Sequence, residues 1–205
     1  MSQIAPTTPF TAAPARNARR PNDWRWESPG TGWPVAWRRP DGPRVNKPEP
    51  ALDAERILRA LSEHGVDYIL IGGLAVQTHG HVRTTNDADL IPAPDPANLG
   101  RLAAALRQLE ARVLNPGQEQ TSIDAKMLPR ATIWQFATKD GGIDVRHKVP
   151  GGRSYDELSE HSLRVRLGDV DVPVVGLDDL IQMKLARGRP VDLADVAALT
   201  DPDAE

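Results

Sequence analysis

Two aspartates separated by one residue are the clearest candidates for chemistry in this chain. Asp87 and Asp89 lead into the apolar pair Leu90-Ile91, which predicts a buried strand. Residues i and i+2 of a strand face the same side, so the two carboxylates can converge. Like charges held this close repel unless a cation lies between them, and Mg²⁺ prefers oxygen ligands. The pattern favours a metal site over the plainer alternative, a solvated acidic cluster after Asn86.

A pair of glycines precedes these acids, at the expected junction between a strand and a helix. Gly72 and Gly73 follow the apolar stretch Tyr68–Ile71. Free backbone N–H groups at the positive end of a helix favour a bound phosphate. A phosphate-binding turn followed in the same structural unit by a metal-binding acidic pair predicts nucleotide chemistry.

A third carboxylate is the next requirement of such chemistry. Two divalent ions roughly 3.5–4 Å apart can clamp the attacking and leaving oxygens of a phosphoryl or nucleotidyl transfer, and they need one more acid from a neighbouring strand. Asp144 is our candidate, because it lies between Ile143 and Val145 in an apolar–acid–apolar strand pattern. The alternative is a turn residue that follows Gly141-Gly142. The presence of Asp87 and Asp89 favours the metal role.

Composition excludes several classes of protein. The 205 residues carry 25 Lys or Arg against 28 Asp or Glu, a net charge of −3, so no overall basic field attracts nucleic acid. The chain has no cysteine, which excludes disulfides and thiolate metal sites. No apolar run reaches membrane-spanning length, and the N-terminus lacks the layout of a signal peptide. We expect a soluble cytoplasmic protein with no membrane partner.

Residues 1–50 differ in composition from the rest of the chain. They hold ten of the 19 prolines and four of the 5 tryptophans, interleaved with arginines. Proline at this density blocks regular hydrogen bonding, so we expect a disordered or extended segment. Its tryptophans and arginines either pack along the surface of the folded part or form an arm that stacks on nucleic-acid bases.

Residues 51–205 predict one folded domain. Asp53 and Asp95 are expected helix N-caps, and two β-hairpins are expected, each with a turn that contains glycine. The expected helices are 53–65, 73–79, 95–112, 177–187 and 192–199, and the expected strands are 68–71, 88–91, 132–138, 143–149, 163–167 and 170–175. This order predicts an α+β fold, a mixed β-sheet with flanking helices and a short helical C-terminus.

The region from Leu52 to Leu199 resembles the nucleotidyltransferase superfamily with the polymerase-beta-like palm. The motifs are Gly72-Gly73, the spacing Arg83-x-Thr85-x-Asp87-x-Asp89, and Asp144. The closest resemblance is to minimal nucleotidyltransferases and AbiEii-type toxins. It implies that Gly72, Gly73, Arg83 and Thr85 bind the nucleotide triphosphate, and that Asp87, Asp89 and Asp144 bind the metal. One departure is Gly73, because the Gly-Ser form of the motif supplies a hydroxyl to the triphosphate.

The C-terminal stretch from Leu177 to Asp195 also resembles the AbiEii-type branch. The resemblance implies that Lys184 contacts nucleotide phosphate and that Asp192 orients this lysine or supports catalysis. A structural alternative is open for both residues. Asp192 is expected in the first turn of the last helix, where a negative charge is favourable, and Lys184 could be solvated.

These features lead to a first expectation about function. It is an Mg²⁺-dependent (or Mn²⁺-dependent) enzyme that binds two ions and moves NMP from an NTP to an RNA end or a protein hydroxyl. The resemblance adds a toxin role with a cognate antitoxin. An RNA acceptor would be held by basic side chains near the cleft. The candidates are Arg83, Arg146, Lys148 and Arg153.

Two other functions remain as alternatives. One is a weakly active or inactive palm-like domain that binds nucleotide or a partner protein, for which the missing serine is a weak argument. The other is an antibiotic-adenylating enzyme. It is disfavoured because such enzymes usually carry a larger C-terminal helical domain than residues 177–205 can form.

Overall fold

The computed structural model describes residues 25–26, 37–38, 51–149, 151 and 153–201. The chain divides into two units, Met1–Pro48 and Glu49–Glu205. In the first unit, β1 (Arg25–Trp26) pairs antiparallel with β2 (Trp37–Arg38). A disordered or extended segment with a tryptophan-rich arm is expected over residues 1–50. The rest of that range lies outside the described residues.

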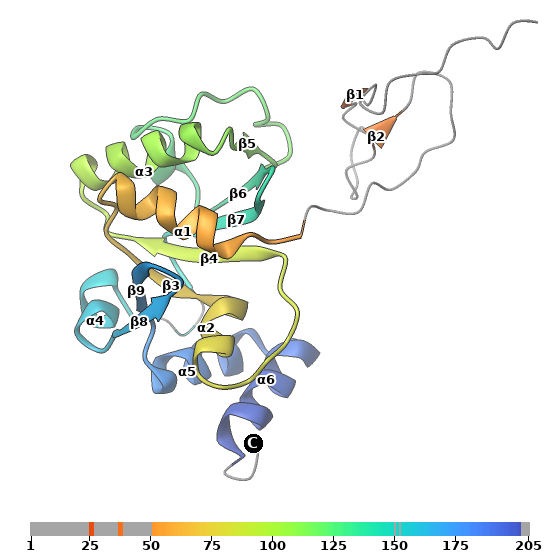
Figure 1. Ribbon diagram of the computed structural model, residues 1–205, viewed down its shortest axis with the longest axis vertical. Helices are drawn as coiled ribbons and strands as arrows, with labels where there is room; N and C mark the ends of the chain where they lie inside the picture. Colours follow the sequence, from red (N-terminus) through yellow and green to blue (C-terminus); the bar gives the residue numbers. More distant parts are fainter. Residues whose placement is uncertain (1–24, 27–36, 39–50, 150, 152, 202–205) are drawn as a thin grey trace, which may run out of the picture. The chain divides into compact units, whose positions relative to one another are not determined.

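A mixed sheet organises the second unit (Figure 1). Its described strands lie in the order β5-β6-β7-β4-β3-β9-β8. Strands β4 and β7 are parallel neighbours, as are β3 and β9, and the other neighbouring pairs are antiparallel. The strands are β3 (Tyr68–Ile71), β4 (Asp87–Pro92), β5 (Arg112–Val113), β6 (Ile133–Thr138), β7 (Gly141–Arg146), β8 (Leu163–Leu167) and β9 (Val170–Val174).

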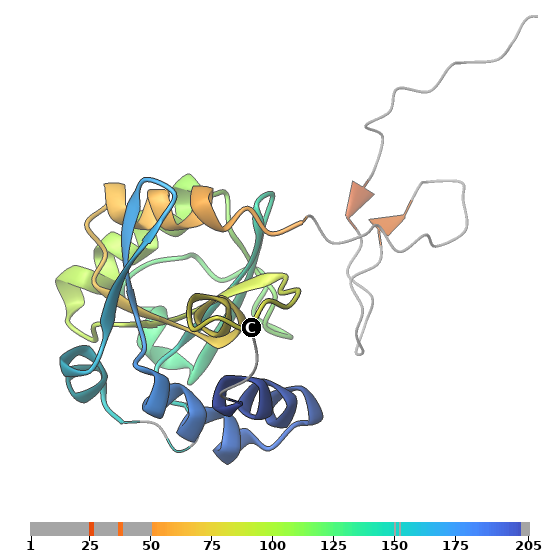
Figure 2. The same cartoon turned by 60° about the horizontal axis from the view of Figure 1, so that its bottom comes forward.

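Helices cover both faces of this sheet. Helices α1 and α3 lie together on one side, and α2, α5 and α6 gather on the other (Figures 1 and 2). The helices are α1 (Ala54–Glu63), α2 (Gly72–Thr78), α3 (Pro96–Gln108), α4 (Tyr155–Glu160), α5 (Leu177–Arg187) and α6 (Pro190–Thr200), and η1 (Leu128–Arg130) is a 3₁₀ turn. No helix in the described part of the chain is both long and apolar enough to cross a bilayer.

The predicted α+β architecture is confirmed. Asp53 and Asp95 cap α1 and α3 by accepting hydrogen bonds from the backbone N–H groups of Arg56 and Asn98, at 3.0 and 2.9 Å. The apolar residues Ile57, Leu58 and Leu61 of α1 and Leu99, Leu102 and Leu106 of α3 are buried, and both predicted hairpins are present. The apolar spacing thus fixes the faces of α1 and α3 that pack on the sheet.

Several details differ from the sequence prediction. Helix α3 ends at Gln108 rather than near residue 112, because Glu110 adopts a positive φ of 53° and Arg112 begins β5. Strand β7 spans Gly141–Arg146 rather than 143–149. The short helix α4 was not predicted, although Ser154 and Glu157 form a capping box at its start.

Candidate functional site

The predicted acids meet at the centre of the sheet. In the ladders, Asp89 of β4 lies opposite Ile71 of β3 on one side and Asp144 of β7 on the other. Asp144 in turn pairs with Gln135 of β6. Strand neighbours lie about 4.8 Å apart with side chains on the same face, so Asp89 and Asp144 are adjacent. Both are buried, with 7% and 6% exposure. Asp87, two residues before Asp89, shares that face and is partly exposed.

An arginine bridges the two buried carboxylates. Arg146 follows Asp144 by two residues on β7, so it also shares the acidic face. Its Nε donates to Asp89 Oδ1 at 2.9 Å, and its Nη2 donates to Asp144 Oδ2 at 2.7 Å. Gln135 Nε2 donates to the other oxygen of Asp144 at 3.3 Å. Two charge-assisted contacts from one planar group fix the spacing of the acids.

Burial disfavours the ionised form of both bridged acids. Burial, and then the charge of Asp89, raises the pKa of Asp144 to about 6, although Arg146 opposes the shift. Burial likewise raises the pKa of Asp89 against the effect of Arg146. A raised carboxyl pKa means that the ionised form is poorly compensated. Asp87, Asp89 and Asp144 form an oxygen-only donor set, and a guanidinium already lies between two of them, so these residues fit a bound cation.

The acids are not arranged as a three-ligand site in this conformation. Within the described residues, no three His, Cys, Asp or Glu side chains are positioned to hold one metal ion. Arg146 engages one oxygen of each buried acid. The predicted metal ligands are thus neighbours, and their metal role stays a prediction.

The glycine turn lies directly against the acids. Gly72 has a φ of +70°, and a Cβ atom there would overlap the carboxylate of Asp89. At Gly73 a Cβ would lie 2.5 Å from Thr85 Oγ1 and 2.9 Å from Arg83 Nη2. Thr85 Oγ1 also donates to Asp87 Oδ1 at 3.1 Å. The structure therefore brings the predicted nucleotide-binding residues Gly72, Gly73, Arg83 and Thr85 together beside the acids.

The predicted phosphate ligand Lys184 lies in a buried ion network. Lys184 is 4% exposed, and Asp192 and Asp195 are each 1% exposed. Lys184 Nζ lies 2.6 Å from Asp195 Oδ2 and 3.6 Å from Asp192 Oδ1. Arg83 reaches the same group from the loop before β4, with its Nε 3.0 Å from Asp195 Oδ1, without hydrogen-bond geometry. The solvated alternative for Lys184 is excluded in this conformation, and its contact with nucleotide stays a prediction.

Other cations approach from the junction of α5 and α6. Arg189 binds Asp192 with two hydrogen bonds, at 2.6 and 3.0 Å. Burial lowers the pKa of Arg187, and the charges of Arg146 and Arg189 lower it further. The charge of Arg187 in turn stabilises ionised Asp89. Sequence reasoning gave no role to Asp195 or Arg189 and placed Arg146 at an RNA surface. The i, i+2 spacing of Asp144 and Arg146 was the signal for a shared face.

Comparison with solved structures identifies the fold. The crystal structure of the lincosamide antibiotic adenylyltransferase LnuA, with lincomycin bound, matches with a TM-score of 0.52 and 13% identity. The match covers 76% of this chain and 99% of that one. The fold is that of a nucleotidyltransferase. No protein-family profile and no curated protein sequence matches the chain.

Two further solved structures match with lower TM-scores. The antibiotic-resistance factor ANT(2'')-Ia has 17% identity and a TM-score of 0.48, with 70% of this chain and 78% of that chain covered. A putative nucleotidyltransferase from Thermotoga maritima has 15% identity and a TM-score of 0.45, with 70% and 86% covered.

Two of the four basic residues predicted to hold RNA, Lys148 and Arg153, make no hydrogen bond or ion pair with Asp87, Asp89 or Asp144 among the described residues. Lys148 is exposed beyond the end of β7. Arg153 is exposed, lies 3.4 Å from Asp179 Oδ1, and contacts His161 Nδ1 at 2.6 Å. Of the four candidates, Arg146 pairs with Asp89 and Asp144, and Arg83 pairs with Asp195.

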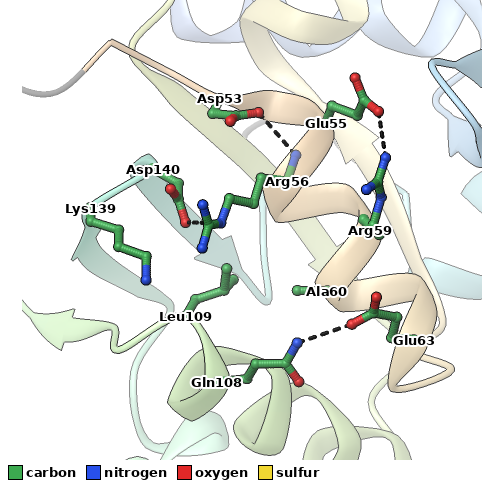
Figure 3. Close-up of a pocket in the computed structure, with 10 residues that line it drawn as sticks. All are labelled: Asp53, Glu55, Arg56, Arg59, Ala60, Glu63, Gln108, Leu109, Lys139 and Asp140. Atoms are coloured by element: carbon green, nitrogen blue, oxygen red, sulfur yellow. Dashed lines mark hydrogen bonds and ion pairs between the residues drawn. The ribbon is translucent and has the colours of Figure 1, made fainter.

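A separate cavity of about 460 Å³ opens beside α1, α3 and the β6–β7 turn (Figure 3). Its charged groups pair with one another, as in the contacts of Arg56 with Asp140 at 3.1 Å and Arg59 with Glu55 at 2.6 Å. None of the predicted site residues lines it. The predicted site residues therefore lie on the acidic face and at the junction of α5 and α6, not around this cavity.

Proposed function

We propose that this protein is an Mg²⁺-dependent nucleotidyltransferase that moves NMP from an NTP to a hydroxyl acceptor. The observation that carries the proposal is the pairing of Asp89 with Asp144 on parallel strands. Asp87 lies on the same face, and Gly72 lies directly against Asp89. Buried like charges placed side by side are costly, and the cost is justified where they bind a cation.

The acceptor oxygen attacks the α-phosphorus of the NTP, forms a new P–O bond and releases pyrophosphate and the hydroxyl proton. Asp87, Asp89 and Asp144 would hold two Mg²⁺ ions, or Mn²⁺, which would supply charge neutralisation for the attacking and leaving oxygens. Thr85 and Arg83, which lie beside Gly73, would donate to phosphate oxygens. Lys184 pairs with Asp195 and Asp192, and it shares Asp195 with Arg83. Lys184 would therefore either help to hold Asp195 beside Arg83 or leave these acids to reach the phosphate.

An RNA end or a protein hydroxyl is the acceptor implied by the resemblance to AbiEii-type toxins, together with a toxin role and a cognate antitoxin. A small-molecule hydroxyl is a second candidate. LnuA is described as a lincosamide adenylyltransferase, and this chain covers 99% of the LnuA chain. The argument that residues 177–205 are too few for such an enzyme therefore does not hold for this neighbour.

Incubation with each α-labelled NTP and Mg²⁺ tests the proposal, using three acceptor pools: total RNA, total protein and a panel of hydroxyl-bearing antibiotics. Label in one pool identifies the acceptor class. Asp87→Asn and Asp89→Asn should each reduce labelling more than about a hundredfold, since even the loss of a residue that supports a metal ligand costs 10- to 100-fold. Binding of NTP without transfer to any pool would favour the inactive palm-like alternative. Unchanged labelling by the double variant would show that these acids are not the metal ligands.

A further inference from the structure

Arg146 binds both of the buried acids that the proposed cation would contact. It contacts Asp89 Oδ1 and Asp144 Oδ2, one oxygen from each buried acid. Its side chain is 15% exposed, so the contacts are shielded from solvent. A charge pair in such surroundings is weakly screened and strongly coupled.

This placement makes Arg146 and a divalent ion competitors for the same carboxylates. The guanidinium is a single positive charge that faces Asp89 and Asp144, with Asp87 on the same strand face. A divalent ion that engages both buried acids competes with the guanidinium for their negative charge, and it displaces an arginine contact wherever it takes Asp89 Oδ1 or Asp144 Oδ2. The displaced guanidinium then needs another anion, because a buried unpaired charge is costly. Asp192, the acid of the adjacent network, is already held by Arg189 through two hydrogen bonds.

We infer that Arg146 couples metal binding to nucleotide binding at this site, an inference that rests on the proposed function. Arg146 is a positioning residue that acts as the resident counter-ion of Asp89 and Asp144. The triphosphate is the anion that accepts its guanidinium, whose planar fork suits phosphate oxygens. Metal alone therefore binds weakly, and metal and NTP bind together. By thermodynamic linkage, each ligand raises the affinity for the other by the same factor.

The test measures Mn²⁺ binding by electron paramagnetic resonance, with and without an NTP analogue that carries an α,β-methylene bridge and cannot be transferred. In the wild type, the analogue should raise the Mn²⁺ affinity by about 5- to 150-fold, the usual range of such coupling. In Arg146→Gln, Mn²⁺ alone should bind more tightly than in the wild type. The analogue should then add less than about threefold, with its own affinity reduced.

Two variants separate coupling from a purely structural role. Arg146→Lys keeps the charge but lacks the fork that reaches both acids, so its coupling should be intermediate. Arg112→Gln removes an exposed arginine from β5 of the same sheet and should retain wild-type coupling. Thermal unfolding without ligand checks that each variant folds. Should Arg146→Gln not fold, wild-type coupling in Arg146→Lys overturns the inference and intermediate coupling supports it.

The outcomes are distinct from those that test the enzyme. Unchanged coupling in Arg146→Gln, with Mn²⁺ and analogue still bound, overturns the inference and leaves the proposed function standing. A wild-type protein that binds neither Mn²⁺ nor the analogue overturns both.

Discussion

Gly73 and Thr85 occupy one small volume beside the acids, and only one of them can fill it with a side chain. A Cβ of residue 73 would lie only 2.5 Å from Thr85 Oγ1, 2.8 Å from the Thr85 Cβ and 2.9 Å from Arg83 Nη2. A hydroxyl from residue 85 therefore lies beside the turn, which itself lacks the hydroxyl of a Gly-Ser pair.

Gly73→Ala is expected to destabilise the protein by about 1–3 kcal/mol, the usual cost of overpacking. The new methyl group must displace Thr85 or Arg83, both of which hold other contacts. Urea unfolding measures the change. Thr85→Gly removes the side chain that the new methyl group meets. Gly73→Ala should therefore cost less stability in the Thr85→Gly background than in the wild type.

Gly100 is a matched control for this substitution. It lies inside helix α3, and a Cβ there would meet nothing within 4 Å. Gly100→Ala should stabilise the protein by roughly 0.5–1 kcal/mol, because alanine loses less backbone entropy in a helix. Equal effects at the two glycines would show that Thr85 and Arg83 do not occupy the space beside Gly73.

Asp144 predicts a pH dependence of stability. Its folded pKa of about 6 exceeds the unfolded value of about 3.9, so the native state binds more protons between these values. Without metal, the free energy of unfolding should therefore fall as pH rises from about 4 to about 6. Mg²⁺ binds the ionised form, so it should raise the unfolding temperature more at pH 7.5 than at pH 5.

Asp144→Asn is the control for this prediction. The amide does not titrate, so the fall in stability between about pH 4 and pH 6 should become smaller, with the part due to Asp89 remaining. The stabilisation by Mg²⁺ at pH 7.5 should be lost. If Mg²⁺ stabilises wild type and variant equally at both pH values, Asp144 is not a metal ligand.

At the scale of elements, the strands and helices that hold the acids could be predicted because their signals are local. The apolar stretch before Gly72, the caps Asp53 and Asp95, and the alternation around Asp144 each require only neighbouring residues. The bridge from Arg146 to Asp89 could not be predicted, because it depends on the parallel pairing of β4 with β7. Strand pairing across the long intervening segment has no local signal in one sequence.

The junction of α5 and α6 shows the same limit. Lys184 and Asp192 were recognised through resemblance, but their burial results from how α5 and α6 pack together and meet Arg83 from the loop before β4. A lysine in the last turn of a helix is ordinarily exposed. Only the three-dimensional contacts show that two buried carboxylates surround this one.

Lys184→Ala is therefore expected to reduce the free energy of unfolding by about 3–5 kcal/mol, the cost of removing one partner from a buried ion pair. Asp195 and Asp192 would be left as buried charges with less compensation. A double-mutant cycle with Asp195→Ala should show that the double variant loses less than the sum of the single losses. Urea unfolding of all four proteins gives the coupling energy.

Lys139→Ala is the matched control, because Lys139 pairs with Glu110 at 3.4 Å on the surface, with 51% of its side chain exposed. It should change stability by less than about 0.5 kcal/mol. A Lys184→Ala variant with near wild-type stability but a raised KM for NTP would reassign this lysine from the structural network to direct nucleotide contact.

At the scale of the whole molecule, the unit Glu49–Glu205 contains a complete sheet and its covering helices. Its buried apolar residues come from both faces of that sheet, from α1 and α3 as well as from α2 and α5. A unit with its own hydrophobic core can fold alone.

Deletion of residues 1–50 should therefore leave a cooperatively folding protein that still binds Mn²⁺ and NTP. The deletion also removes four of the 5 tryptophans and leaves Trp134 as the single reporter. Trp134 is 1% exposed, and its Nε1 donates to the Leu128 carbonyl at 2.8 Å. Its fluorescence in the truncated protein should be blue-shifted and should shift to the red in one transition that coincides with the circular dichroism. A red-shifted emission in buffer, or aggregation, would mean that residues 1–50 complete the core.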